Sequence, residues 1–531
     1  MPSIIRKSRG MIARLWQRDT SLFAPATAPA AVHAAVAHRL GWLDTPVTMR
    51  PRLAEIREVL AGARADGLTN MVLLGMGGSS LCADVLRQSV PFAREAANLT
   101  MLDSTDERTV LQVANAIDAR TTVFLVASKS GSTIEVDALE RFFRAWAERG
   151  LGGNAGRHFI AVTDPGTPLA AHAAAAGYRH AFINPPDIGG RYSALSLFGL
   201  VPAAWLGIDL DAMLTSAADM ADRCHETPDR NPGYQLGMFM AEHATAGRDK
   251  LTLLPTVPFG MWIEQLVAES TGKDGRGTLP IVDEPAGKVA AYHHDRAFVA
   301  MITDRGNHTD AFATELERAG HPVFRIDATS STLAAEFFRW EFATAVAGHG
   351  IGVNPFDEPN VSDAKARTKT MLNHYLAHGA WPERADVTRH GEVERRRIGA
   401  RADATPGPGY VALLDYLPTD RNRMGMIERT RLRIRRQTNA ATTYGVGPRY
   451  LHSTGQYHKG GPNSGHFVLM SAADETATEI PGAGYTFSVL KHAQALGDVE
   501  ALAAAGRDVL HVHLTSASDE PSMLMERVLS E

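Results

Sequence analysis

The sequence predicts an α/β protein built from doubly wound parallel sheets. Short apolar runs alternate with segments of helical periodicity along most of the chain, which is the pattern of parallel strands joined by helices. Two of these runs end in loops of small polar residues, Gly75–Ser80 and Ser128–Thr133, and a helical pattern follows each loop. Hydrophobic residues make up 44% of the chain and charged residues 21%, as in ordinary globular proteins. This composition excludes a wholly disordered chain, a coiled coil and a collagen-like fibre.

Length, charge and cysteine content narrow the class further. At ~150 residues per domain, a chain of 531 residues suggests about three to four domains. The 54 basic and 59 acidic residues give a formal net charge of −5, so no basic excess points to nucleic acid. Two cysteines, Cys82 and Cys224, cannot form a disulfide framework, and no Cys/His cluster has the spacing of a zinc site. The reducing cytoplasm is therefore the expected compartment.

The apolar runs are too short for export or membrane insertion. The N-terminal twenty residues lack the continuous ~7 to 15 apolar residues of a signal peptide. No stretch approaches the ~18 to 20 apolar residues of a membrane span. We therefore expect neither a membrane nor nucleic acid as a partner.

The first half of the chain divides into a helical segment and an α/β domain. Residues 1–50 are expected to be largely helical, and residues 51–207 to form the first α/β domain. Short apolar runs predict its strands, at 70–75, 99–102, 122–127, 158–162 and 181–183. Apolar spacing predicts its helices, at 51–66, from 81 onward, at 106–118 and at 134–149.

A second round of alternation and a third segment follow. Residues 208–402 are expected to form a second α/β domain, and the Pro/Gly cluster at 403–408 marks a boundary before a C-terminal α/β segment, 403–531. Strands are predicted in these two parts at 250–254, 298–302, 323–326, 410–417 and 509–514. Helices are predicted at 212–225, 230–246, 309–318, 330–348 and 422–437.

Both small-residue loops have the features of a phosphate site. Backbone N–H groups at the start of a helix are unpaired, and the helix dipole makes them attractive to anions. Ser128, Ser130, Ser132 and Thr133 add hydroxyl donors. Such loops suit one terminal phosphate monoester that is held by neutral donors rather than by a metal.

Other interpretations of these loops are weaker. A dinucleotide-binding GxGxxG motif fails because Ser80 occupies the position of the third glycine. Neither loop has the Gly-Lys-Ser/Thr ending of a P-loop. Ordinary helix caps in a Ser/Gly-rich connection remain an alternative for either loop alone.

Four motifs in order resemble the glucose-6-phosphate isomerase family. The two loops together resemble sugar-isomerase (SIS) domains. Three further segments resemble the family's first signature, its glutamate-bearing helix and its second signature: Asp187–Ser193, Trp262–Lys273 and Phe356–Lys365. Others resemble the isomerase part of transaldolase/glucose-6-phosphate isomerase fusions: Arg14–Trp16, Leu40–Leu43 and His452–Asn463. The transaldolase barrel of those fusions has no counterpart in this sequence, so transaldolase activity is not expected.

The resemblance implies a fold and a reaction. The fold would be two SIS-type doubly wound parallel-sheet domains followed by a C-terminal α/β segment. The protein would be an aldose–ketose isomerase that interconverts glucose 6-phosphate and fructose 6-phosphate through an enediolate, without metal or cofactor. The family commonly forms homodimers, so a homodimer is expected.

Two other functions stay open at this point. One is a non-catalytic SIS-type sensor of sugar phosphates, and the other is an isomerase of a related phosphosugar, such as mannose or an amino sugar. The arginine run at 429–436 would suit a sensor that reads DNA, but the net charge of −5 argues against that role. We interpret the run as a solvated face or an acid-pairing patch.

Moving a proton between carbons 1 and 2 requires a base and a cation that faces the enediolate oxygens. By resemblance Glu269 is the base, and a carboxylate near apolar walls can have the raised pKa that this role needs. Glu284 is the competing candidate. Arg191 follows two glycines and is expected to stabilise the enediolate, since a guanidinium does not deprotonate.

Opening the sugar ring requires a further acid/base group. Lys365 aligns with the family's ring-opening lysine, and His293 is the nearest candidate for its ring-opening histidine, with His294 and His308 as alternatives. Residues expected to hold the substrate and its phosphate are Gly78, Ser79, Ser128, Lys129, Ser130, Thr133 and Gln265.

The second signature departs from the family pattern. Glu358 stands where the family has glutamine, and a carboxylate beside a phosphorylated substrate would repel it unless protonated or paired. Asn360 replaces a glycine and Ser362 a glutamate. Three residues of the loop near 460 match the fusions without a chemical role that can be assigned: Gln456, His458 and Lys459.

Overall fold

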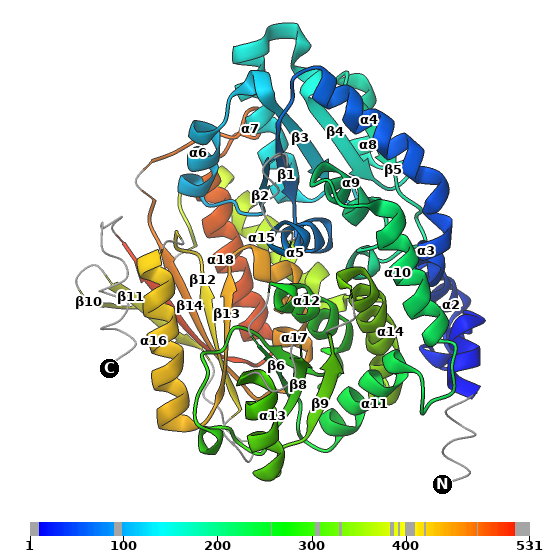
Figure 1. The fold of residues 1–531 in the computed structure, drawn as a ribbon. Helices are drawn as coiled ribbons and strands as arrows, with labels where there is room; N and C mark the ends of the chain where they lie inside the picture. Colours follow the sequence, from blue (N-terminus) through cyan, green and yellow to red (C-terminus); the bar gives the residue numbers. More distant parts are fainter. Residues whose placement is uncertain are drawn as a thin grey trace.

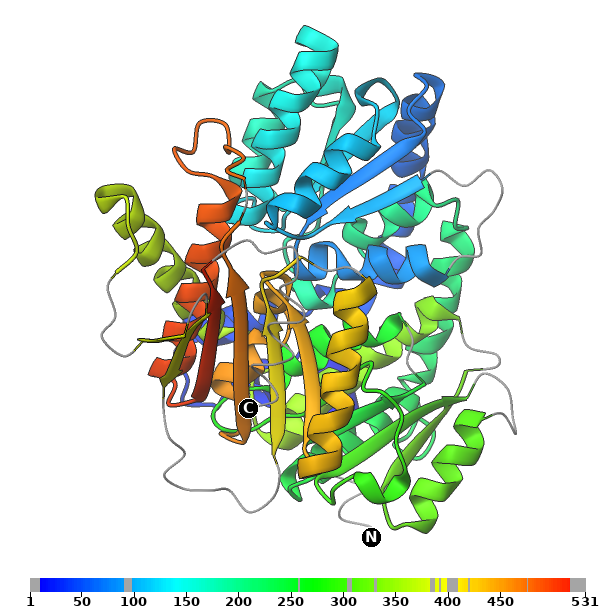
Figure 2. The same cartoon turned by 90° about the vertical axis from the view of Figure 1, so that its left-hand side faces the viewer.

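The computed structural model contains three sheets that meet around a common centre (Figures 1 and 2). It describes residues 10–89, 98–255, 258–302, 308–328, 332–382, 387–390, 393–398, 409–418, 421–474 and 476–515. In Figure 2 the first sheet lies at the top, the second at the lower right and the third at the lower left. Within the described part of the chain, no helix is both long and apolar enough to cross a membrane.

The first sheet is fully parallel, in the order β2-β1-β3-β4-β5. Its strands lie close to the predicted ranges: β1 (Asn70–Gly75), β2 (Asn98–Leu102), β3 (Thr122–Ala127), β4 (Phe159–Thr163) and β5 (His180–Ile183). The surrounding helices are α4 (Leu53–Ala65), α5 (Leu81–Ser89), α6 (Glu107–Ala116), α7 (Ile134–Leu151), α8 (Pro168–Ala175) and α9 (Leu197–Trp205).

Alternation along the strands explains why helices cover both faces. Side chains of successive strand residues point to opposite faces. Met71 and Leu73 of β1 join the core that contains α4, α5 and α9, whereas Val72 and Leu74 join the core with α6, α7 and α8. The first sheet is therefore doubly wound, as predicted from its continuous apolar strands.

The second sheet is also parallel, in the order β7-β6-β8-β9. Its strands are β6 (Lys250–Leu254), β7 (Leu279–Ile281), β8 (Arg296–Ile302) and β9 (Val323–Asp327). The helices around it are α10 (Leu210–Arg223), α11 (Pro232–Thr245), α12 (Phe259–Thr271), α13 (His308–Arg318) and α14 (Leu333–Ile351). Sequence patterns did not predict β7, because it has only three residues and Pro280 interrupts it.

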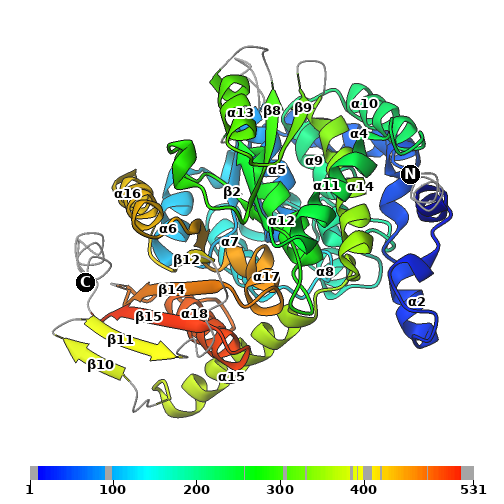
Figure 3. The same ribbon diagram turned by 90° about the horizontal axis from the view of Figure 1, so that it is seen from below.

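The third sheet is mixed, in the order β10-β11-β15-β14-β12-β13. Strands β12 to β15 are mutually parallel, and β11 is antiparallel to both β15 and β10. The strands are β10 (Val387–His390), β11 (Val393–Ile398), β12 (Tyr410–Asp415), β13 (Ala441–Val446), β14 (Gly465–Ala472) and β15 (Asp508–Leu514). The helices beside them are α15 (Pro359–His378), α16 (Arg421–Thr438), α17 (Gly455–Gly460) and α18 (Phe487–Ala504), seen from below in Figure 3.

Strands β10 and β11 precede the boundary expected near residue 403, yet they pair with the third sheet. They form the edge of that sheet, and β11 contains the charged run Glu394–Arg397. Such short, charged edge strands lack the apolar alternation by which strands are recognised in a sequence. Their position means that the chain enters the third sheet soon after α15.

Candidate active site

A cavity of about 490 Å³ lies where the three sheets meet. It is lined by the loop after β1, the loop after β3, the short helix η7 (Gly190–Tyr192), α12, the start of α15 and the helix η9 (Arg449–His452). Of the residues predicted to be functional, it brings together Gly78, Ser79, Lys129, Ser130, Thr133, Arg191, Gln265, Glu269 and Lys365. Two predicted site residues, Ser128 and His293, are not among those that line it.

Glycines allow the loop after β1 to approach the other walls. Gly77 has a φ of +55°, and a Cβ there would lie 2.6 Å from Gln265 Nε2 and 2.8 Å from the carbonyl oxygen of His452. A Cβ on Gly78 would lie 2.1 Å from the carbonyl oxygen of Gly190. Both positions therefore require glycine for packing, a reason that is separate from the phosphate argument.

The loop after β3 is held by its own hydroxyls. Ser128 is buried, its Oγ lies 3.0 Å from Thr133 Oγ1, and it accepts a hydrogen bond from the Gly131 N–H at 3.1 Å. Ser128 thus shapes the loop, whereas Ser130 and Thr133 line the cavity. Thr133 precedes the first turn of α7, where free N–H groups and the helix dipole favour an anion.

Lys129 lines the same cavity but is already paired. Its ammonium contacts Asp164 and donates to the Pro186 carbonyl oxygen at 3.3 Å. Burial raises the pKa of Asp164, and the ammonium of Lys129 opposes that effect. The lysine therefore presents a partly neutralised charge to the cavity.

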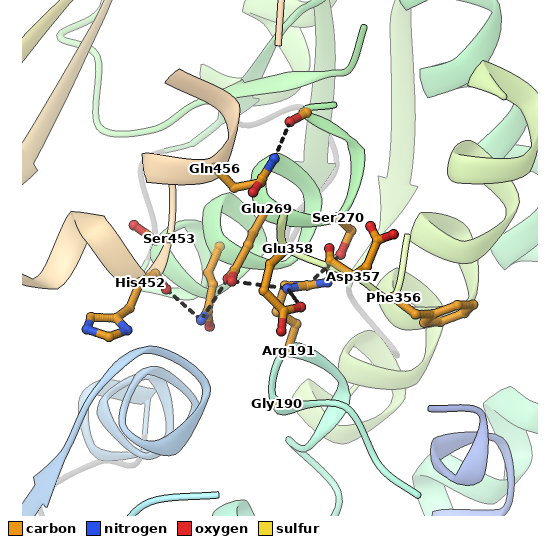
Figure 4. A network of polar contacts seen from close by, with 12 residues as sticks. Gly190, Arg191, Glu269, Ser270, Phe356, Asp357, Glu358, His452, Ser453 and Gln456 are labelled. Atoms are coloured by element: carbon orange, nitrogen blue, oxygen red, sulfur yellow. Dashed lines mark hydrogen bonds and ion pairs between the residues drawn. The ribbon is translucent and has the colours of Figure 1, made fainter. Parts of the chain in front are cut away.

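Arg191 is buried, and all three nitrogens of its guanidinium make polar contacts (Figure 4). Its Nε donates to Ser270 Oγ at 2.9 Å, and its Nη2 donates to the carbonyl oxygens of Pro355 and Asp357, each at 3.1 Å. Its Nη1 lies 3.0 Å from Glu269 Oε1. A planar fork held at this many points is a fixed cation, as enediolate stabilisation requires.

Glu269 and Gln265 lie one turn apart on α12, so both face the cavity. Gln265 Nε2 donates to the carbonyl oxygen of His452 at 2.7 Å and lies 3.4 Å from Glu269 Oε2. Burial raises the pKa of Glu269; Arg191 opposes this rise and the nearby carboxylate of Glu358 adds to it. A base whose pKa lies above the ordinary carboxylate value is suited to taking a proton and returning it.

Glu358 shares Arg191 with Glu269. Its Oε2 lies 3.0 Å from Arg191 Nη1, and its Oε1 lies 3.8 Å from Arg39 Nη2. Desolvation works against its ionisation, but Arg191 and Arg39 hold the pKa of Glu358 below its ordinary value. From the sequence, this carboxylate was expected to repel an anionic substrate unless it was protonated or paired. In the structure it is ionised and paired.

His452 lines the cavity although no sequence pattern assigned it a role. Its Nε2 lies 3.0 Å from Glu135 Oε1 of α7, and Glu135 also accepts from Gln494 Nε2 of α18 at 2.7 Å. The first sheet and the third segment thus orient one imidazole together. The available signal was the motif His452–Asn463, whose first residue is this histidine.

Of the candidate residues for ring opening that the sequence suggested, only the lysine lines the cavity. Lys365 of α15 is exposed and lines the cavity. His293 lies just before β8, with its Nδ1 3.3 Å from Asp295 Oδ1 and its ring centroid 3.8 Å from that of His294. His308 begins α13 and is exposed. None of these three histidines lines the cavity. His293 and His294 lie in a short loop before β8, in another part of the second sheet.

The contacts of Glu284, the competing candidate for the base, indicate a structural role. Its carboxylate accepts hydrogen bonds from Arg296 at 3.0 and 3.1 Å and from the Thr442 hydroxyl at 2.9 Å, and it pairs with Arg435 at 3.2 Å. Burial opposes its ionisation, but these arginines lower the pKa of Glu284 to about 2. Part of the arginine run of α16 is thus the acid-pairing patch that the sequence suggested.

The three residues without an assigned role are buried near the cavity but do not line it. Gln456 donates to the Gly272 carbonyl oxygen at 3.0 Å and to Asn360 Oδ1 at 2.7 Å, and it accepts from the Asn360 N–H at 2.9 Å. It therefore joins the end of α12 to the start of α15. His458 pairs with the Tyr410 hydroxyl at 3.0 Å and Lys459 with Asp498 at 2.7 Å, both within the third segment.

Comparisons with known proteins agree with the resemblance. A family model described as phosphoglucose isomerase matches residues 48–289. The glucose-6-phosphate isomerase of Symbiobacterium thermophilum is 30% identical over 389 residues, which cover 62% of this chain and 86% of that protein. The glucose-6-phosphate isomerase of Rubrobacter xylanophilus is 30% identical over 387 residues, covering 62% and 89%.

Solved structures share the fold. A hypothetical protein of Thermus thermophilus superposes with a TM-score of 0.58 at 24% identity and covers 70% of this chain and 97% of its own. A glucose-6-phosphate isomerase of Chlamydia trachomatis superposes with a TM-score of 0.52 at 21% identity, covering 69% and 78%. The chain thus shares with these structures an α/β fold, which here has two parallel sheets followed by a mixed α/β segment.

Proposed function

Because this chain belongs to the glucose-6-phosphate isomerase family, we propose that it interconverts glucose 6-phosphate and fructose 6-phosphate. The observation that carries the proposal is one cavity that holds Glu269, the cation of Arg191 3.0 Å away, and both phosphate-type loops. A sensor would need the loops but has no use for a buried carboxylate with a raised pKa beside a fixed cation.

The proton transfer follows from this geometry. The phosphate of the open-chain sugar binds the hydroxyls of Ser79, Ser130 and Thr133 and the N–H group of Gly78. Carbons 1 and 2 then lie beside Glu269, which takes the proton from one carbon and returns it to the other. Arg191 stabilises the negative charge that develops on the enediolate oxygens, and it needs no movement to do so.

Ring opening requires an acid for the ring oxygen and a base for the anomeric hydroxyl. We assign this step to His452 and Lys365 in place of His293, because both line the cavity and His293 does not. The carboxylate of Glu135 orients the imidazole of His452. Exposed Lys365, which also lines the cavity, supplies a second proton carrier.

A coupled assay tests the reaction itself. Purified protein in EDTA should convert fructose 6-phosphate to glucose 6-phosphate, detected by a glucose-6-phosphate dehydrogenase, because the proposed groups supply acid, base and cation without a metal. The same assay with mannose 6-phosphate measures the specificity that motifs do not reveal. No turnover of fructose 6-phosphate, with or without added divalent cations, would rule out the proposed function.

His452→Gln should separate ring opening from proton transfer. We expect turnover of glucose 6-phosphate to fall about 100-fold, within the range of a lost acid/base group. Erythrose 4-phosphate cannot form a ring because its terminal hydroxyl is phosphorylated, so its isomerisation should change less than threefold. Rates measured for both substrates decide the assignment, and an equal loss on both would place His452 outside the ring-opening step.

His293→Gln is the matched control. Because His293 does not line the cavity, both rates should stay within about twofold of the wild type. The proposal also includes the homodimer and the cytoplasmic location expected from the sequence. Light scattering during size-exclusion chromatography measures the first.

A further inference from the structure

At the end of the cavity proposed for proton transfer, two carboxylates contact the same guanidinium nitrogen. Arg191 Nη1 lies 3.0 Å from Glu269 Oε1 and 3.0 Å from Glu358 Oε2 (Figure 4). The two carboxylate oxygens are therefore separated by no more than twice that distance. Both side chains line the cavity, so a substrate carbon beside Glu269 also lies close to Glu358.

Other charges nearby do not cancel the second carboxylate at this point. Arg39 reaches Glu358 only at 3.8 Å, and the exposed fraction of both side chains is about a third, so this contact is partly screened. Lys273 pairs with Asp357 at 2.7 Å and also contacts the Asn354 carbonyl oxygen. Of these two cations, Lys273 is thus matched by another carboxylate, and Arg39 reaches Glu358 only at the limit of an ion pair.

We propose that Glu358 is a specificity-determining residue that makes the cavity reject sugar phosphates with a second anionic group at carbon 1. The ligands rejected are those of the aldonic acid class, whose carbon 1 is a carboxylate. Ligands with a neutral aldehyde or alcohol at carbon 1 bind. This inference rests on the proposed function, because it needs the phosphate at the Ser128–Thr133 loop and carbon 1 beside Glu269.

The physical reason is the repulsion of like charges where water is scarce. Where water is scarce, two nearby negative charges repel strongly because the effective dielectric constant lies below that of water. The enediolate meets less of this repulsion than an aldonate does, because it forms only after Glu269 has taken a proton and lost its own charge. A neutral carbonyl or hydroxyl avoids this cost, and a hydroxyl can donate a hydrogen bond to the carboxylate. A glutamine at this position could still accept a bond from Arg191 but would not repel an anion.

Calorimetric titration with two matched ligands tests the proposal. The ligands are 6-phosphogluconate, which has a carboxylate at carbon 1, and sorbitol 6-phosphate, which has an alcohol there. We expect Glu358→Gln to tighten the binding of 6-phosphogluconate about tenfold and to change that of sorbitol 6-phosphate less than twofold. Glu358→Asp keeps the charge and should keep the wild-type ratio of the two dissociation constants.

Asp363→Asn is the matched control, since it removes a carboxylate of α15, the helix that begins next to Glu358, that pairs with Arg367 at 2.8 Å and does not line the cavity. Its ratio of dissociation constants should equal that of the wild type. An unchanged ratio in Glu358→Gln, or an equal shift in Asp363→Asn, would overturn the proposal. Binding of neither ligand to the wild type would instead contradict the phosphate site and the proposed function with it.

Glu358 should also affect the ionisation of Glu269, a readout that a purely structural role would not change. The ionisable groups that act on Glu269 are Arg191, Glu358 and His452. Because Glu358 contributes to the raised pKa of Glu269, its replacement by glutamine should move the acidic limb of the pH–rate profile to lower pH. A limb that stays in place, together with an unchanged ligand ratio, would leave Glu358 without the assigned role.

Discussion

Glu269→Gln is expected to lower the turnover of fructose 6-phosphate by at least about 1,000-fold while sugar-phosphate binding stays within threefold of the wild type. Glutamine has the same shape and can still accept a hydrogen bond from Arg191, but it cannot take a proton from carbon. The coupled assay measures turnover, and calorimetry with sorbitol 6-phosphate measures binding. Turnover near the wild-type rate would mean that another group is the base.

Glu264→Gln provides the matched control on the same helix. Glu264 is also a carboxyl on α12, and burial raises its pKa to about 8, yet it lines a different cavity, together with Met261 and Arg431. Its replacement should change turnover less than threefold. A comparable loss in both variants would indicate damage to α12 rather than removal of a base.

The pH dependence of the wild type should show the raised pKa of Glu269. The base must be ionised to act, so kcat/KM should fall as the pH drops through the pKa of Glu269 in the free enzyme. Because burial and Glu358 raise that pKa, the fall should begin above the ordinary carboxylate range near ~4.5. In Glu269→Gln the remaining activity should lack this limb.

Arg191→Lys is expected to lower kcat about 100- to 1,000-fold, although it keeps a positive charge. A lysine ammonium cannot reproduce the planar fork that reaches Glu269, Glu358 and Ser270 together. It also leaves buried carbonyl oxygens without donors, at a cost of about 1 to 3 kcal/mol each. The thermal midpoint should therefore fall together with kcat.

Arg296→Lys separates the two effects of the arginine change. Arg296 is fully buried and binds Glu284 through two hydrogen bonds, but it does not line the cavity. Its replacement should lower the thermal midpoint by a similar amount and leave kcat, measured below that midpoint, within about threefold. If kcat fell as far as in Arg191→Lys, the loss in the latter could not be assigned to enediolate stabilisation.

Local patterns predicted most of the first two sheets and several of the residues that line the cavity. Continuous apolar runs such as 70–75 and 122–127 predicted buried parallel strands, and each loop that follows a strand lies at the same end of its sheet. The spacing of four residues between Gln265 and Glu269 placed both on one face of a helix. Arg191 could be singled out because the two preceding glycines and its signature are contiguous in the chain.

The sequence did not predict contacts between distant segments. Position along the chain favours His293, which follows Glu284 closely, but packing brings His452, 183 residues beyond Glu269, into the cavity by way of Glu135. No sequence pattern predicted the pairing of Glu284 with Arg296 and Arg435 either. Strands β10 and β11 were missed because charged edge strands have no apolar period.

The sequence alone determined most strands and helices of the first two sheets, the two small-residue loops and the family, because all of these depend on neighbours within a few residues or on contiguous motifs. The tertiary structure decided which histidines reach the cavity, that Glu269 rather than Glu284 lines it, and that Glu358 shares Arg191 with Glu269. These outcomes depend on how α12, α15 and η9 pack together. That packing sets distances of about 3 Å between side chains far apart in the chain, and such distances leave no local pattern to read.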